Sequence, residues 1–448
     1  MSSNSPASLF SSSRALLERA PSVRRLAAYR GQLSRVGDGR ILRRVRLIWF
    51  LLFFNVLGAA ANPLLHIPHR VGQALTQGAL VAAVLLALTI NPRVRIRPNI
   101  YLGLFTVLGV TSLMSSVRFV SLGTDYRAVR LLAFLAVMWL LTPWWGRRDL
   151  LLLRAQVGFL VVILASVVLG LLVSPHTALN GGRLGGAIWP IAATQVAHYA
   201  AELTGISVLL WACRLMQPRI AILLAAPSFA VLILTHTRTA LAAAGIGGLV
   251  AFVSLLTSSR RTRRAFATVV LTIALVGLPL SPLIVSWLAR GESPAQLATL
   301  TGRTTFWGYV FAEQRTETQK ILGDGLSNGS INGKIVFDGV SGVGDGLPID
   351  DSWVLDYQDQ GIVGDVLTGL MFVVLLVMAA FATRGPRRAI ALFLVVYCLA
   401  ASFTEDGAGI ASQYAMDMTL AASLMVPEVG RRAVGWRRER PAAQLKGP

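Results

Sequence analysis

Four aspartates lie within fifteen residues of the chain, in the segment LPIDDSWVLDYQDQG at positions 347–361. They are Asp350, Asp351, Asp356 and Asp359. Carboxylates at this density can accept a proton from a reacting hydroxyl group. They can also be structural, because Asp350 and Asp351 suit the capping of a following helix, and the other two, three residues apart, suit one solvated helix face. A calcium site is a further possibility, although the spacing does not follow the EF-hand pattern.

Three arginines stand in segments rich in glycine, threonine or serine: Arg183 in NGGRLGGAIWP, Arg238 in LTHTRTALAAAG and Arg303 in TGRTTFWGYV. A guanidinium group is planar, permanently charged and able to bind two phosphate oxygens at once. Arginines that converge on one point therefore predict a diphosphate site, whereas isolated ones are typical of surfaces and lipid headgroup contacts. Trp353 and Tyr357, one helical turn apart, can stack on a sugar ring or anchor the chain at a membrane interface.

The composition is that of a membrane protein. The chain is 54% hydrophobic and only 14% charged, whereas soluble domains carry about 25% charged residues. Apolar runs of about 20 residues, long enough to cross a bilayer, recur from end to end. The two cysteines, Cys213 and Cys398, both lie in apolar runs, and the five histidines are scattered. We therefore expect an all-α, polytopic helical membrane protein without disulfides, metal or other cofactor.

The apolar runs predict about twelve transmembrane helices. Their approximate positions are 47–65, 71–90, 100–117, 127–145, 150–173, 195–213, 220–235, 239–257, 266–286, 361–382, 389–403 and 409–426. With the N-terminus in the cytoplasm, 30 of the 42 Lys and Arg residues fall on the cytoplasmic side. The positive-inside rule therefore predicts that both termini are cytoplasmic. It also accounts for most of the net charge of +21 without a nucleic-acid partner.

This topology divides the chain into five parts. They are a basic cytoplasmic tail (1–46), nine transmembrane helices (47–286), a large external loop (287–360), three further transmembrane helices (361–426) and a second basic tail (427–448). The external loop holds ten of the 21 acidic residues. Its segments RTTFWGYVFAEQR and DDSWVLDYQDQG predict helices, the second of them with a break at Gly361, and the stretch between them predicts irregular structure.

Three ionisable residues stand out inside the predicted membrane spans: Arg130, Glu202 and Asp417. An ionisable side chain in a bilayer is costly and marks a pathway or a site, or else pairs with another to hold helices together. Arg154, near a cytoplasmic helix end, is expected to extend its guanidinium to the membrane surface.

The chain resembles the O-antigen ligase/polymerase superfamily. The resemblance rests on twelve spans with one large external loop between the ninth and tenth, and on three segments in order. These are LTHTRTALAAAGIGGLV, TGRTTFWGYVFAEQRTETQKILGDGLSN and DDSWVLDYQDQGIVGDVL. GGRLGGAIWPIAATQVAHYAA is also similar to the family's segment before its sixth span.

The resemblance implies an inverting, metal-independent glycosyltransferase of GT-C architecture, with a polyprenyl-diphosphate-linked glycan as donor. It implies that Arg238 and Arg303 hold the diphosphate, with Arg183 as a further candidate. Asp350 or Asp351 stands where ligases of the family carry a histidine near the acceptor hydroxyl. An aspartate there is more similar to the polymerase branch.

The expected function is therefore polymerisation or transfer of a lipid-linked glycan to an acceptor sugar hydroxyl at the outer face of the cytoplasmic membrane. Its expected partners are membrane lipid, the donor glycan, an acceptor glycan and other components of envelope biosynthesis. Ligase-type transfer of a completed glycan to a lipid or protein acceptor stays open. A lipid-linked glycan transporter also stays open, although such a transporter would more often show paired repeats. A non-catalytic assembly subunit is a third possibility.

Overall fold

The computed structural model of the chain describes residues 36–57, 64, 67–119, 122–256, 303–312, 314–326 and 351–427. The predicted span 266–286, much of the predicted external loop, including most of its irregular stretch and Asp350, and most of both predicted tails lie outside these residues. In the part that is described, each predicted span overlaps a helix, although the bounds differ. The long helices are α3 (Val36–Val56), α4 (His69–Ile90), α5 (Ile100–Phe119), α6 (Leu122–Leu141), α7 (Leu151–Val173), α9 (Ala193–Ala212), α10 (Pro218–Leu234), α11 (Arg238–Leu256), α17 (Ser352–Phe381), α18 (Pro386–Ala401) and α19 (Gln413–Met425).

Several short elements join or flank the long helices. They are η1 (Thr142–Trp144), α8 (Pro175–Ala178), strands β1 (Leu179–Asn180) and β2 (Arg183–Leu184), α15 (Arg303–Ala312) and α16 (Glu317–Leu322). The two strands form an antiparallel hairpin, which the all-α expectation did not include. Helix α3 also begins at Val36, eleven residues before the predicted span. Its first turns carry arginines, which are good helix formers but lower the hydropathy on which the span prediction relied.

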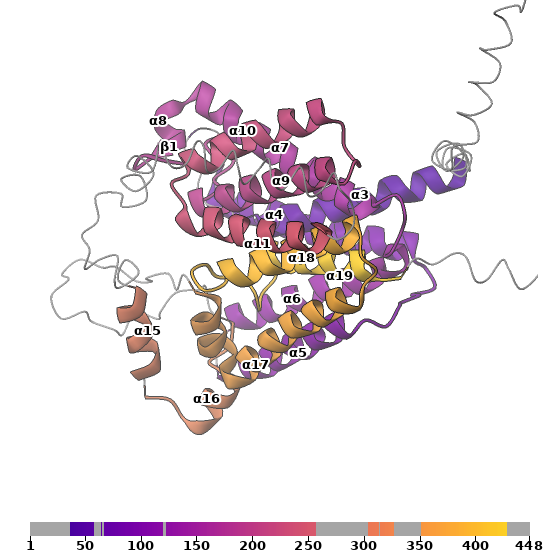
Figure 1. Ribbon diagram of the computed structural model, residues 1–448. Coiled ribbons are helices and arrows are strands. Elements are labelled where there is room, and N and C mark those ends of the chain that lie inside the picture. Colours follow the sequence, from indigo (N-terminus) through magenta and orange to yellow (C-terminus); the bar gives the residue numbers. More distant parts are fainter. Residues whose placement is uncertain are drawn as a thin grey trace, which may run out of the picture.

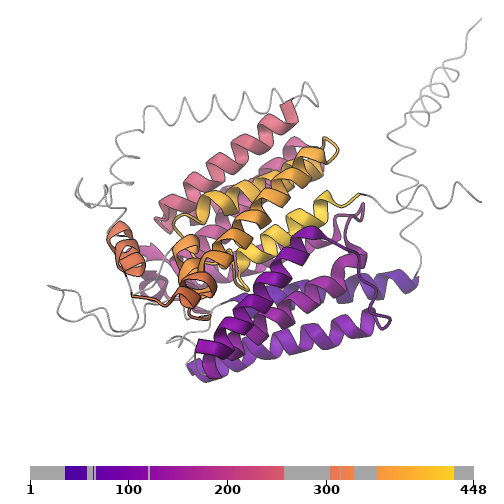
Figure 2. The same ribbon diagram turned by 90° about the horizontal axis from the view of Figure 1, so that it is seen from below.

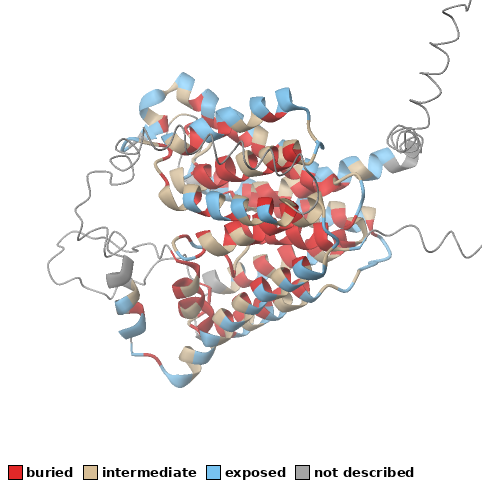
Figure 3. Ribbon diagram, viewed as in Figure 1, coloured by how far each residue is buried: buried red, intermediate tan, exposed pale blue. Residues whose placement is uncertain are grey.

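Among the described residues, six helical segments are long and apolar enough to cross a membrane. They are Arg70–Ile90, Ile100–Arg118, Asp125–Trp144, Leu151–Val173, Arg238–Leu256 and Ser352–Phe381. Helix α10 is apolar but shorter. Large apolar side chains lie exposed on the outside of the bundle, among them Leu85, Met114, Leu172 and Leu223, where a bilayer would cover them. Figure 3 shows buried residues gathered inside the bundle and exposed ones on its outside.

The long helices lie side by side (Figure 1), and the indigo and purple helices α3 to α6 group on one side of the bundle (Figure 2). Small residues let the other helices approach closely. A Cβ placed at Gly205 of α9 would lie 2.1 Å from the Phe393 ring of α18, and one at Gly247 of α11 would lie 2.9 Å from the Phe393 main-chain oxygen. Phe393 therefore packs against both glycines, and α11 and α18 are in close contact near the middle of each helix.

The helix ends gather in two sets. At the first, which we call the Asp351 end, α17 begins beside the loop between α18 and α19, because Ser352 Oγ donates to the Glu405 main-chain oxygen at 2.8 Å. The segments after α15 and α16 lie at this same end, where Ser115 Oγ of α5 donates to the Gly323 oxygen at 3.0 Å. At the opposite end, which we call the Arg387 end, Arg387 at the start of α18 donates to the Gly146 oxygen after η1 at 3.1 Å.

Candidate functional site

A tight hairpin places Arg183 at the Asp351 end. Gly181 and Gly182 form its two-residue turn, both with positive φ (59° and 74°), which is the conformation that two-residue hairpin turns prefer and glycine adopts without strain. The Arg183 guanidinium donates to the main-chain oxygen of Thr235 and to the hydroxyl oxygen of Thr237, at 3.1 Å each. The hairpin is therefore attached to the turn that precedes Arg238.

Arg238 is the first residue of α11. The turn before it is sharp, because His236 has a left-handed backbone with φ of 53°. Thr235 and Thr237 in this turn are buried, and both contact Arg183. The structure thus brings Arg183 to the segment that carries Arg238, although 55 positions separate the two arginines in the sequence.

Glu405 connects this arginine segment to the start of α17. Thr239 Oγ1, one residue after Arg238, donates to Glu405 Oε1 at 3.2 Å. The Glu405 main-chain oxygen accepts from Ser352 Oγ at 2.8 Å. Glu405 itself is only 7% exposed. Glu405 therefore links the arginine segment, through its carboxylate, to the residue that follows Asp351, through its main-chain oxygen.

Asp351 is the N-cap of α17. Its Oδ1 accepts a hydrogen bond from the Val354 main-chain nitrogen at 2.9 Å, as expected of an aspartate at a helix start. Its side chain is buried, and the N-terminal end of the helix favours its negative charge. The capping role that the sequence allowed is therefore present, within one residue of the Ser352–Glu405 contact.

Asp356 and Asp359 are buried, so the expectation that they form a solvated helix face is wrong. They are 1% and 2% exposed. Thr368 Oγ1 donates to Asp356 Oδ2 at 2.8 Å, and the loop between α18 and α19 covers this carboxylate. The periodicity of a sequence shows which residues share a helix face but not which distant segment packs on it.

Gly361 breaks α17, as the sequence predicted, with φ of 66° and ψ of −163°. The carbonyl oxygens that the break leaves without helix partners are bound by another segment. The main-chain nitrogens of Asp324 and Gly325 donate to the oxygens of Gln358 and Asp359, at 2.9 Å each. The residues after α16 therefore cap the first half of α17.

Helix α16 was not predicted, although its sequence carries a recognisable start signal. Thr316 and Gln319 form a reciprocal capping box, in which each side chain binds the other residue's main-chain nitrogen. The pattern TETQ fits the S/T-x-x-E/Q signature of such boxes. Arg315, just before it, forms a 3.4 Å ion pair with Asp324 and lies 5.2 Å from the centre of the Tyr357 ring.

The two aromatic candidates occupy different surroundings. The Trp353 indole donates to Ser402 Oγ at 3.1 Å and packs near Phe403. The Tyr357 ring packs against Phe311 of α15, 5.3 Å between ring centres. Both side chains are half-buried at the Asp351 end.

Arg303 and Asp350 are the two candidates whose side chains the structure does not describe. Arg303 is the first residue of α15. Asp350 directly precedes Asp351 and lies outside the described residues.

The charged residues predicted inside the membrane do not act as one group. Glu202 and Asp417 share a single amide donor, Gln156, whereas the electrostatic neighbours of Arg130 are Tyr126 and Arg127 on its own helix. Arg154 is exposed on α7.

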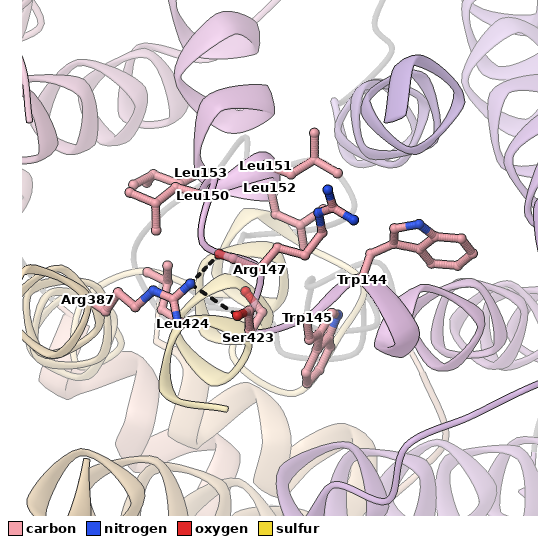
Figure 4. A pocket seen from close by; sticks show the side chains of 11 residues that line it. Trp144, Trp145, Arg147, Leu150, Leu151, Leu152, Leu153, Arg387, Ser423 and Leu424 are labelled. Carbon is pink, nitrogen blue, oxygen red and sulfur yellow. Dashed lines mark hydrogen bonds between the residues drawn. The ribbon is translucent and has the colours of Figure 1, made fainter. Parts of the chain in front are cut away.

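A small pocket lies at the Arg387 end of the bundle, opposite the Asp351 end (Figure 4). It has room for about one water molecule. The Arg387 guanidinium donates to the main-chain oxygens of Gly146 and Arg147, and the Gly146 nitrogen donates to the Ser423 oxygen at 3.1 Å. These hydrogen bonds join three segments of the bundle at the pocket: the turn after η1, the start of α18 and the end of α19.

Together, the long apolar helices, their close packing and their buried polar contacts define a polytopic, helical, membrane-embedded protein. The sequence matches no protein-family model and no curated protein. Within the described residues, no group of three or more His, Cys, Asp or Glu side chains is arranged to hold a metal ion.

Glu405 is the residue of this region that sequence inspection missed. It lies in SFTEDGAGI, a short loop between two predicted spans, and its only signal was an acidic pair, Glu405 and Asp406, on the predicted external side. The arginine candidates were found because a guanidinium in a glycine- and threonine-rich segment is unusual, whereas an acidic pair in a loop is not.

Proposed function

We propose that the protein is a membrane glycosyltransferase of GT-C type, similar to O-antigen polymerases. It polymerises or transfers a polyprenyl-diphosphate-linked glycan at the outer face of the cytoplasmic membrane, with both termini in the cytoplasm. The observation that carries the proposal is the chain of contacts from Arg183 through Thr237, Thr239 and Glu405 to Ser352. It joins cationic residues suited to a diphosphate to a carboxylate-rich helix start, at one end of an apolar bundle.

In this proposal Arg183, Arg238 and Arg303 bind the diphosphate, and Asp351 or Asp350 orients the acceptor hydroxyl. The bond between the anomeric carbon and the phosphate oxygen breaks, and the acceptor oxygen bonds to that carbon. The lipid diphosphate leaves as an anion, whose developing charge the arginines stabilise. The acceptor proton passes to the aspartate carboxylate.

The two roles of Asp351 can be separated by substitution. Serine is as good an N-cap as aspartate but cannot act as a base, whereas alanine does neither. If Asp351 takes part in the chemistry, Asp351→Ser stays folded and loses transfer, as Asp351→Ala does. If Asp351 only caps the helix, Asp351→Ser retains wild-type activity. Asp350 is then the remaining candidate for the group that orients the acceptor hydroxyl, and the role of an aspartate is excluded if Asp350→Ser is also active.

The proposal is tested in cells that lack the protein, by gel profiles of their surface and lipid-linked glycans. Complementation with wild type restores the profile, whereas Arg238→Ala and Arg303→Ala do not, despite normal amounts in the membrane. Arg219→Ala, which removes an exposed arginine elsewhere in the chain, is the matched control and restores it.

The accumulated material distinguishes the alternatives. Single repeat units on the lipid carrier identify a polymerase. Full-length chains left on the carrier outside the cell identify a ligase. Glycan trapped on the cytoplasmic side identifies a transporter and excludes the catalytic role of the aspartates. Full activity of Arg303→Ala excludes the proposed diphosphate site, which includes Arg303.

A further inference from the structure

Two carboxyl groups lie against each other inside the helix bundle. Glu202 of α9 and Asp417 of α19 are both fully buried, with 0% exposure. Both accept a hydrogen bond from the same amide nitrogen, Gln156 Nε2, so the two carboxyl groups lie close together. Two negative charges at this separation in a medium without water would repel strongly, and neither could be hydrated.

Gln156 of α7 bridges the pair. Its Nε2 donates to Glu202 Oε1 and, at 2.5 Å, to Asp417 Oδ1. Its Oε1 accepts from Trp49 Nε1 of α3 at 3.3 Å. An indole nitrogen can only donate, so this contact requires the amide oxygen to face Trp49 and both amide hydrogens to face the carboxyl groups.

A second amide occupies another oxygen of the pair. Gln413 Nε2, one turn before Asp417 on α19, donates to Glu202 Oε2 at 3.2 Å. Three of the four carboxyl oxygens therefore have amide donors. The fourth, Asp417 Oδ2, is buried and has no hydrogen-bond partner among the groups that the structure describes.

The donor arrangement selects a proton over a metal cation. Three oxygens face N–H hydrogens, which would repel a cation and take up the lone pairs that it needs. A proton on Asp417 Oδ2 or on the facing Glu202 oxygen completes the hydrogen bonding and removes one of the two charges. We propose that Glu202 and Asp417 form a binding site for a single proton within the bundle, with Gln156 and Gln413 as its fixed amide donors.

Other ionisable groups surround the pair, and most of them are phenols. One turn toward the Asp351 end, His198 Nε2 and Tyr414 Oη are hydrogen-bonded at 2.9 Å, and His198 Nδ1 binds Tyr397 Oη. The groups that interact electrostatically with the pair are Tyr101 of α5, Tyr199 of α9, and Tyr397 and Cys398 of α18. Phenols and thiols are ordinarily uncharged at neutral pH, so they supply no counter-charge to a doubly ionised pair.

Infrared spectroscopy of the full-length protein in lipid nanodiscs tests the proposal. A protonated carboxyl group gives a C=O stretching band that ionised carboxylates lack, and exchange into D₂O shifts that band. The wild-type protein is expected to show such a band at neutral pH. Asp417→Asn and Glu202→Gln are each expected to lose one carboxylic acid band, since a lone carboxylate among amide donors needs no proton.

Glu317→Gln is the matched control, because Glu317 is exposed and paired with Lys320 outside the bundle. It should leave the band unchanged. An identical band in the wild type and in both folded pair variants would overturn the proposal. Absence of any carboxylic acid band from the wild type would also overturn it, and this measurement does not depend on any variant folding. The proton site does not rest on the glycan-transfer proposal, so the two can fail separately.

Discussion

The carboxylate of Asp356 lies against the backbone of Gly409. A Cβ at Gly409 would be 2.4 Å from Asp356 Oδ1 and 2.8 Å from its Cγ. The Gly409 main-chain oxygen also accepts from Gln360 Nε2 at 3.2 Å. The loop between α18 and α19, which carries Glu405, therefore rests directly on the first half of α17, and only glycine allows so close an approach.

Gly409→Ala should destabilise the protein by about 1–3 kcal/mol, because the added methyl group must displace a buried, hydrogen-bonded carboxylate. Thermal unfolding of the purified protein in detergent measures the change. Gly158→Ala is the control, since nothing lies within 4 Å of a Cβ at that α7 position. Equal melting temperatures for the two variants would contradict the close contact.

Gly361→Ala should detach α16 from α17. A Cβ at Gly361 would lie 2.4 Å from the main-chain carbon of Ile321, and a φ of 66° with ψ of −163° is strained for any residue with a side chain. We expect faster hydrogen exchange at the main-chain nitrogens of Asp324 and Gly325, measured by mass spectrometry. Gly103→Ala in α5, where a Cβ has open space, should leave that exchange unchanged.

Glu405 is expected to act as a positioning residue for Arg238. Glu405→Ala removes the acceptor of the Thr239 hydroxyl, and the loss of one hydrogen bond of about 1 kcal/mol corresponds to roughly a fivefold loss of transfer. Glu405→Gln keeps an oxygen at this position and should retain most activity, and Thr239→Val should resemble Glu405→Ala. Inactivation by Glu405→Gln as complete as that by Glu405→Ala would instead indicate that the carboxylate takes part in the chemistry.

Arg387→Ala should loosen the opposite end of the bundle without affecting the Asp351 end. It removes the hydrogen bonds to the main-chain oxygens of Gly146 and Arg147, which should cost about 1–2 kcal/mol because the group is charged but partly exposed. The variant should melt at a lower temperature and retain its activity below that temperature. Arg219→Ala, at an exposed position, serves as the comparison, and a loss of activity without destabilisation would argue against this purely structural role.

Much of the local structure could be predicted because its causes are local. Long apolar runs gave the helix positions, an aspartate before SWVL gave the start of α17, and Gly361 gave its break. The capping box at Thr316 was equally visible in the sequence and could have predicted α16. Each of these signals depends on residues within a few positions of one another, where backbone geometry alone relates sequence to structure.

By itself, the sequence determined that this is a helical membrane protein, where most of its helices lie and which charged residues are unusual. Only the tertiary structure decided how those residues combine. Arg183 came to lie at the turn before Arg238, Asp356 and Asp359 became buried, and Glu202 paired with Asp417, 215 positions away. The physical reason is that hydropathy sets which segments leave water, whereas the partner of a buried polar group depends on how helices distant in sequence pack together.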